Sequence, residues 1–128
     1  MKSKLLVVED HADTALVMAM HLRKAGHLVT VAGSCKEALE AAAADVPEVV
    51  LCDIGLPDGD GCDLLRELKQ KYKVAGIAVS GHGMPEDQQR YRDAGFSEFV
   101  FKPCKIDQLQ EAIVRSRLFV ARGPSTAV

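Results

Sequence analysis

Five short apolar runs recur along the chain, and each is followed by a longer stretch with the composition of a helix. The runs are rich in β-branched residues and are apolar at successive positions, which is typical of strands in a parallel sheet covered on both faces. They occupy residues 5–8, 28–31, 49–52, 77–80 and 99–101. This alternation predicts an α/β fold, a (βα)5 doubly wound sheet of five parallel strands with helices on both faces.

Residues that commonly start and end helices support this division. Ser34 and Glu37 have the spacing of a capping box at the start of the second helix. Pro85, followed by two acids, suits the first turn of the fourth helix. Gly26 and Gly95 stand where glycine caps the C-terminal ends of the first and fourth helices.

Length and composition indicate one globular domain. The chain has 128 residues, 48% hydrophobic and 27% charged, which excludes a disordered chain. We expect the domain to occupy residues 1–120, with 121–128 as a disordered tail or the start of a linker. A formal net charge of −2 argues against nucleic-acid binding. Because no apolar run reaches the ~18 residues of a membrane span and no signal-peptide core is present, we expect no membrane association and a cytoplasmic location.

Two patterns that could indicate other metal sites are weak. The four cysteines contain no C-x-x-C pair, so we expect reduced thiols and set zinc aside. The loop at 55–61 superficially resembles a calcium loop, with Asp58, Asp60 and Asp63 as acids. It lacks the EF-hand order of ligands and the closing glutamate, which favours turn chemistry.

Functional groups stand at the carboxyl ends of four of the five predicted strands. They are the side chains of Glu9, Asp10, Asp53, Ser80 and Lys102. The carboxyl ends of parallel strands meet at one edge, where ligands bind in open α/β sheets. Taken singly, Asp10 could equally be a helix N-cap, and Ser80 a turn hydroxyl.

Together these groups indicate a site for a cation and a phosphoryl group. Crowded carboxylates raise one another's pKa unless a cation neutralises them, and their oxygens suit Mg²⁺, or Mn²⁺ in its place. A carboxylate beside the cation can act as a nucleophile and form an aspartyl phosphate. Lys102 and Ser80 could then bind the phosphoryl oxygens.

Four segments and their separations resemble the response-regulator receiver domains of two-component phosphorelays, the CheY-like superfamily. These segments are VVED (7–10), CDIGLPDGDG (52–61), VSGHG (79–83) and AGFSEFVFKP (94–103), and the resemblance covers residues 4 to about 118. It implies a flavodoxin-like sheet with strand order 2-1-3-4-5.

The resemblance also implies roles for the acidic residues and the lysine. Asp53 would be the phosphoacceptor and Asp10 a direct metal ligand, with Asp53 itself also binding the cation. The Gly55 carbonyl would be a further ligand, and Glu9 would act through metal-bound water. Lys102 would bind the phosphoryl group.

A second group of residues would form the conformational switch. The resemblance implies that Ser80 is the switch hydroxyl, Phe99 the aromatic switch, and Lys102-Pro103 a cis bond. A Phe99 that merely fills the core is the alternative. Gly76 replaces a proline frequent in the family, which we interpret as a looser connection before the fourth strand. We interpret His82 as an exposed loop residue.

The first helix predicts a partner surface. Residues 15–22 carry more apolar positions than one core-facing stripe requires, so some must be exposed. The resemblance implies docking on a histidine-bearing helical bundle, either a histidine kinase or a phosphotransfer domain. The alternatives are a homodimer contact or an apolar surface without a partner, and we expect a monomer or weak dimer.

The resulting hypothesis is a phosphoacceptor signalling switch, which assists its own phosphorylation and dephosphorylation but is not otherwise an enzyme. Phosphorylation of Asp53 would change the surface of the fourth helix, fifth strand and fifth helix. The domain would be a stand-alone receiver or the receiver part of a hybrid sensor kinase. Two alternatives remain: a Mg²⁺-dependent phosphohydrolase of similar fold, and a pseudo-receiver that serves only as an interaction module.

Overall fold

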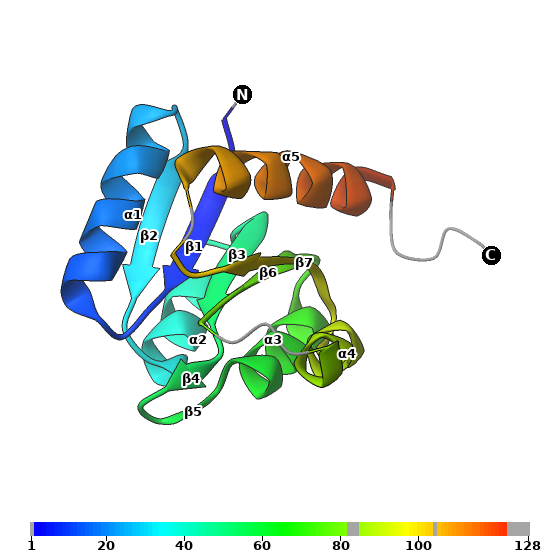
Figure 1. Cartoon of the computed structure of the whole chain (residues 1–128). Coiled ribbons are helices and arrows are strands. Elements are labelled where there is room, and N and C mark those ends of the chain that lie inside the picture. Colours follow the sequence, from blue (N-terminus) through cyan, green and yellow to red (C-terminus); the bar gives the residue numbers. More distant parts are fainter. Residues whose placement is uncertain (1, 82–84, 104, 123–128) are drawn as a thin grey trace.

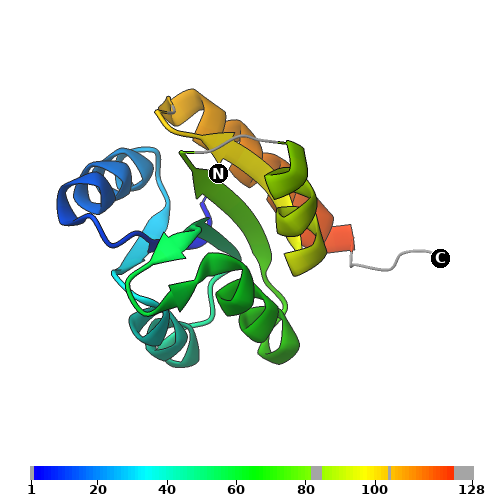
Figure 2. The ribbon, with the colours of Figure 1, turned by 60° about the horizontal axis from the view of Figure 1, so that its bottom comes forward.

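A five-stranded parallel sheet forms the centre of the computed structural model, which describes residues 2–81, 85–103 and 105–122. Five helices in these residues cover its two faces (Figures 1 and 2). The strands of the sheet are β1 (Lys4–Val8), β2 (Leu28–Ala32), β3 (Val49–Asp53), β6 (Ala75–Ser80) and β7 (Phe96–Phe101). The helices are α1 (Ala12–Lys24), α2 (Cys35–Ala44), α3 (Gly61–Lys71), α4 (Pro85–Ala94) and α5 (Ile106–Arg122).

The strand order confirms the predicted topology. The sheet runs β2-β1-β3-β6-β7 with all pairs parallel, which is the expected order 2-1-3-4-5. The last two strands begin earlier than predicted, at Ala75 and Phe96. The sequence did not predict a small antiparallel hairpin of β4 (Gly55–Leu56) and β5 (Gly59–Asp60) in the loop after β3.

Alternate side chains of the sheet enter two separate cores. Leu5 and Val7 of β1 pack with residues of α1 and α5, whereas Leu6 and Val8 pack with α2, α3 and α4. Figure 2 shows α1 and α5 on one side of the sheet and α2 and α3 on the other. The near-continuous apolar runs of β1, β3 and β6 therefore reflect burial on both faces, as predicted, whereas the edge strand β2 is largely exposed.

The helix ends confirm the predicted caps. Ser34 Oγ accepts a hydrogen bond from Glu37 N (3.2 Å), and Glu37 reaches back to Gly33 N (2.9 Å). Gly26 and Gly95 follow α1 and α4 with φ of 104° and 108°, in the left-handed region that favours glycine.

The loop acids cap helices, in agreement with the turn prediction. Asp58 accepts hydrogen bonds from the backbone N–H groups of Cys35 and Lys36 (2.7 and 3.1 Å) at the start of α2. Asp60 is the N-cap of α3 and accepts from Cys62 N (2.6 Å). The loop after β3 is thus joined to two neighbouring helices.

The interpretation of Gly76 is wrong. Gly76 lies inside β6, where an added Cβ would stand 2.5 Å from Leu65 Cδ2, so it allows close packing of α3 on the sheet. At the other end of the domain, α5 continues to Arg122, past the expected boundary at 120. His82, Cys104 and residues 123–128 lie outside the described residues.

Two further findings concern the thiols and the helices. Cys35, Cys52 and Cys62 are free, and burial raises the pKa of Cys35 and of Cys62 to about 11. Their thiols therefore stay protonated near neutral pH. Among the helices of the described residues, none has the length and apolar character needed to span a membrane.

Candidate functional site

Four strands bring the predicted residues to the carboxyl edge of the sheet. Glu9 follows β1, Asp53 ends β3, Ser80 ends β6 and Lys102 follows β7. Backbone hydrogen bonds extend the pairing beyond the strands, from Glu9 N to Ala32 O (3.0 Å) and from Lys102 N to Ser80 O (2.8 Å). The backbone positions of these side chains are therefore fixed by the sheet itself.

Three carboxylates gather at this edge. Oxygen atoms of Glu9, Asp10 and Asp53 all lie within 4.8 Å of one another. Glu9 is buried, Asp53 is half-buried and Asp10 is exposed. The alternative that Asp10 caps α1 is wrong, because His11 is the N-cap residue and its Nδ1 accepts from Thr14 N (3.3 Å). The carboxylate of Asp10 is thus left to the acidic group.

Lys102 provides a positive charge between two of these carboxylates. Its Nζ lies 2.7 Å from Glu9 Oε1 and 3.4 Å from Asp53 Oδ2. The other oxygen of Glu9 accepts from His11 N (3.1 Å). The Lys102-Pro103 peptide bond is cis, as the resemblance implied.

The two carboxylates nearest Lys102 have pKa values shifted in opposite directions. Burial acts to raise the pKa of Glu9, but the hydrogen bonds from Lys102 and from His11 N outweigh it, so this pKa lies below its usual value. The pKa of Asp53 is raised by burial and by the charge of Glu9, against the opposing effect of Lys102. The ammonium therefore compensates Glu9 more fully than Asp53.

The donor set fits a hard divalent cation. The acidic group offers only carboxylate oxygens, and one ammonium faces three potential negative charges. Oxygen-only sites with an excess of negative charge suit Mg²⁺ rather than a softer metal. Gly55, whose carbonyl is a predicted ligand, lies in β4, two residues after Asp53, with open space where a Cβ would stand.

The two predicted switch residues contact a side chain that sequence reasoning missed. Ser80 Oγ is hydrogen-bonded to the hydroxyl of Tyr91 (3.1 Å), and both residues are buried. The Phe99 ring, which is only partly buried, lies 5.9 Å from the Tyr91 ring. Tyr91 is the one aromatic residue in the polar sequence of α4, which could have indicated that it is buried.

A second missed residue lies directly behind Asp53. Gly61 N donates to Ile54 O (2.7 Å), and an added Cβ at Gly61 would stand 2.5 Å from the backbone oxygen of Asp53. Glycine at this position allows the start of α3 to approach the proposed phosphoacceptor closely. The GDG sequence of the loop is a signal for such a close approach, although its residues also suit a turn.

Comparison with known proteins agrees with this geometry. The sequence profile of the response regulator receiver domain matches residues 5–114. The KDP operon transcriptional regulatory protein KdpE of Escherichia coli is 32% identical over 97% of this chain, which spans 54% of that protein. The chain thus spans about half the length of this curated relative.

Solved structures show the same fold. The receiver domain of NtrX from Brucella abortus is 32% identical, with a TM-score of 0.82 over 89% of this chain and 98% of that one. A CheY-like receiver domain protein from Methanospirillum hungatei JF-1, at 24% identity, gives a TM-score of 0.86 over 95% and 98% of the two chains. The chain belongs to the response regulator receiver domain family of two-component signalling systems.

Proposed function

We propose that the domain is a phosphoacceptor switch in which Asp53 receives a phosphoryl group from a phosphohistidine. The observation that carries this proposal is the position of Lys102 Nζ, 3.4 Å from Asp53 in a group of three carboxylates. In the transfer, an oxygen of Asp53 forms a bond to phosphorus while the P–N bond of the donor breaks. The released imidazole nitrogen takes up a proton from solvent.

Asp10, Asp53 and the carbonyl of Gly55 would hold Mg²⁺, with Glu9 acting through a bound water. When bound, Mg²⁺ supplies positive charge that compensates the phosphoryl oxygens. Lys102 provides further positive charge beside Asp53, and Glu9 holds its ammonium in place (2.7 Å). Asp53 attacks as the carboxylate, so the reaction slows towards acidic pH, and its raised pKa moves this loss of rate to higher pH than for an ordinary aspartate.

After the transfer, the Ser80 hydroxyl would bind a phosphoryl oxygen, and Phe99 would turn towards the space it leaves. Support comes from the contacts of both residues with Tyr91 and from the partial burial of Phe99. The change would reach the surface of α4, β7 and α5. This output surface would serve a stand-alone receiver or a hybrid sensor kinase, and we propose no enzymatic activity beyond the receiver's own phosphorylation and dephosphorylation.

Labelling with a small acyl phosphate tests the proposed phosphoacceptor. Wild type should acquire one phosphoryl group in the presence of Mg²⁺ and none after chelation, as read by intact-protein mass spectrometry. Asp53→Asn should stay unlabelled, because an amide is not a nucleophile of this kind. The control Asp63→Asn changes an exposed acid in the first turn of α3 and should be labelled like wild type. Equal labelling of wild type and Asp53→Asn, or no labelling of wild type, would contradict the proposal.

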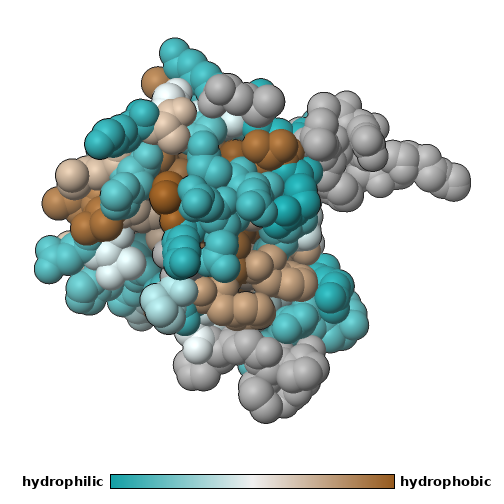
Figure 3. All heavy atoms as spheres, turned by 45° about the horizontal axis from the view of Figure 1, so that its top comes forward, coloured by the Kyte–Doolittle hydropathy of each residue, from teal (hydrophilic) through white to brown (hydrophobic). Residues whose placement is uncertain are grey.

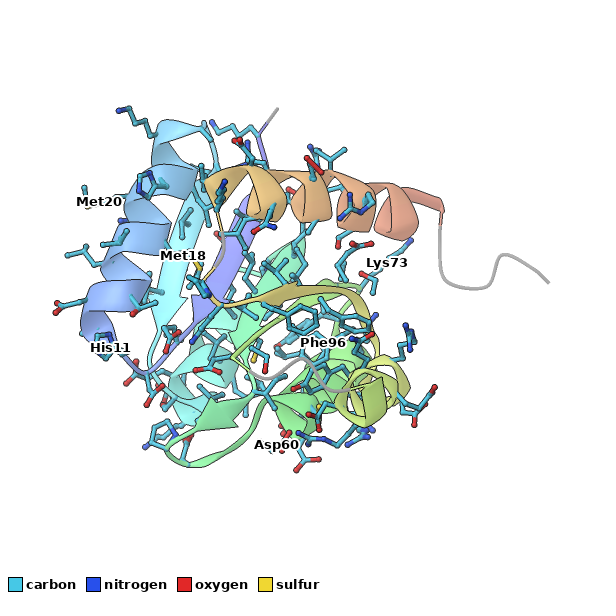
Figure 4. All side chains as sticks on the ribbon, in the orientation of Figure 1. His11, Met18, Met20, Asp60, Lys73 and Phe96 are labelled. Atoms are coloured by element: carbon cyan, nitrogen blue, oxygen red, sulfur yellow. The ribbon has the colours of Figure 1, made fainter. Side chains whose placement is uncertain are left out.

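A groove beside the site supports docking of a histidine kinase or phosphotransfer domain. It lies between α1 and α5, has a volume of about 490 Å³, and includes Val17, Met18, Ile106 and Lys102 in its lining. Exposed apolar side chains gather over α1 (Figure 3), among them Leu16, Val17 and Met20, which are 52–59% exposed. Figure 4 shows Met20 directed away from the sheet and Met18 towards it. Because Lys102 lines this groove and contacts Asp53, a docked helix would bring its phosphohistidine to the acidic edge.

Val17→Glu tests this docking surface. A charge in the groove should slow phosphoryl transfer from a phosphorylated histidine-bearing domain by roughly tenfold or more, through the cost of burying it. Labelling by a small acyl phosphate, which needs no groove, should be unchanged. Val46→Glu is a matched control, because Val46 is 41% exposed in the loop between α2 and β3. If both variants accept phosphoryl groups from the donor equally fast, docking in this groove is ruled out.

A further inference from the structure

Tyr91 contacts both residues to which the switch is assigned. Its hydroxyl is 3.1 Å from Ser80 Oγ, and its ring packs at 54° against the ring of Phe99, 5.9 Å away. Phe96, the first residue of β7, packs edge-on against the same ring, with 6.3 Å between the ring centres. Tyr91 is 2% exposed and Ser80 is 4% exposed, so little water is available to replace their mutual hydrogen bond.

The neighbouring residue ties the same helix to the loop after Asp53. Arg90 Nη1 lies 2.8 Å from Asp60 Oδ2, and its guanidinium group lies 5.6 Å from the centre of the Tyr91 ring. Asp60 is also the N-cap of α3. Two consecutive residues of α4 therefore link this helix to Ser80 at the end of β6 and to Asp60 in the loop after β3.

The hydrogen-bonding capacity of Ser80, Tyr91 and the phosphoryl oxygens limits which bonds can form when Asp53 is phosphorylated. Phosphoryl oxygens only accept hydrogen bonds, so Ser80 must donate its single proton to them. A Ser80 side chain that turns to the phosphoryl group leaves the Tyr91 hydroxyl without this partner inside the core. A buried hydroxyl that loses its hydrogen-bond partner raises the free energy of the new arrangement. A shift of α4 that moves the Tyr91 hydroxyl to a new partner would lower this cost.

We propose that Tyr91 is a positioning residue of the switch: its hydroxyl holds the Ser80 side chain in the unphosphorylated arrangement and releases it on phosphorylation. This inference rests on the proposed role of Ser80 as the switch hydroxyl. Because Tyr91 belongs to α4, release of its hydroxyl transmits the state of Asp53 directly to that helix, in addition to the route through Phe99.

Removal of one hydroxyl tests the proposal. Tyr91→Phe keeps the ring packing but cannot hold Ser80, so it should bind beryllofluoride, a phosphoryl mimic, about 2- to 10-fold more tightly than wild type in the presence of Mg²⁺. Isothermal titration calorimetry measures this affinity. The chain's other tyrosine provides the control: Tyr72 is the C-cap residue of α3, at the opposite end of that helix from Asp60, and Tyr72→Phe should bind like wild type.

A double-mutant cycle separates a positioning role from a general effect on the fold. In a Ser80→Ala background, Tyr91→Phe should leave beryllofluoride affinity unchanged, because there is no hydroxyl to release. Equal or weaker binding by Tyr91→Phe overturns the proposal, and so does the same tightening in the Ser80→Ala background. Failure of the proposed function looks different: wild type itself would then show no Mg²⁺-dependent binding that Asp53→Asn removes.

Discussion

Gly61→Ala is expected to lower the free energy of unfolding by about 3 kcal/mol, at the upper end of the usual cost of overpacking. The added methyl group would stand 2.5 Å from the backbone oxygen of Asp53 and 3.0 Å from Cys52 Sγ. Neither atom can easily move away, because one belongs to the backbone and the other is the sulfur of a buried side chain. Relief of the clash must therefore move the end of β3 or the start of α3. Denaturation by urea, followed by circular dichroism, measures the change.

Gly55→Ala is the matched control for this prediction. Gly55 lies in the same loop, but no atom lies within 4 Å of the position of its added Cβ. Its substitution should change the free energy of unfolding by less than about 0.5 kcal/mol. If the two variants unfold at the same urea concentration, the close approach of α3 to Asp53 does not contribute to stability as we infer. The folded fraction of Gly61→Ala should also be labelled more slowly by an acyl phosphate, since the clash involves the backbone of Asp53.

Lys102→Met is expected to slow phosphorylation of Asp53 by a small acyl phosphate by roughly 100-fold, the usual cost of losing one charge-stabilising donor. Methionine keeps the length and apolar stem of lysine but not the ammonium that contacts Glu9 and Asp53. A time course of acyl-phosphate labelling in the presence of Mg²⁺, quenched at set intervals, gives the rate of phosphorylation. Lys105→Met removes an exposed lysine three residues further along the chain and should react like wild type.

The same variant should shift the pH dependence of labelling. Lys102 lowers the pKa of Asp53, although burial and Glu9 keep that pKa above its usual value. Loss of the ammonium raises it further, so a larger fraction of Asp53 is protonated at a given acidic pH. The pH at which the labelling rate falls on acidification should therefore be higher in Lys102→Met than in wild type. A profile with an unchanged acidic side would show that Lys102 does not control the ionisation of Asp53.

The sheet and the acidic edge were predictable because both follow from local patterns. Runs that are apolar on both faces predict buried parallel strands, and the topology then places Glu9, Asp53, Ser80 and Lys102 at a common edge. No such pattern specifies how a helix sits on the sheet. The bonds from Tyr91 to Ser80 and from Arg90 to Asp60 depend on where α4 packs, which is a tertiary property.

Some glycine and capping positions could likewise be predicted from local sequence, and others could not. The positions of Gly26 and Gly95 followed from helix periodicity, since a chain that reverses after a helix favours a left-handed residue. Gly61 and Gly76 are required by side chains and backbone from distant segments, which a local reading of turns and strands does not contain. For α1, the sequence indicated Asp10 as a possible N-cap, whereas the backbone path places His11 in that position.

The exposed part of Lys102 has a consequence for selectivity between donors. Its side chain is 32% exposed, while it lines the groove between α1 and α5 and contacts the buried Glu9. A helix seated in that groove would displace water from around the ammonium, and attraction between opposite charges grows as water is excluded. A donor that fits the groove well would thus strengthen the attraction between the Lys102 ammonium and the phosphoryl group that it delivers. The receiver would then distinguish cognate from foreign donors even when every receiver has a donor bound. The two donors would differ in the rate of phosphoryl transfer within the complex, and not only in the fraction of receiver that they occupy.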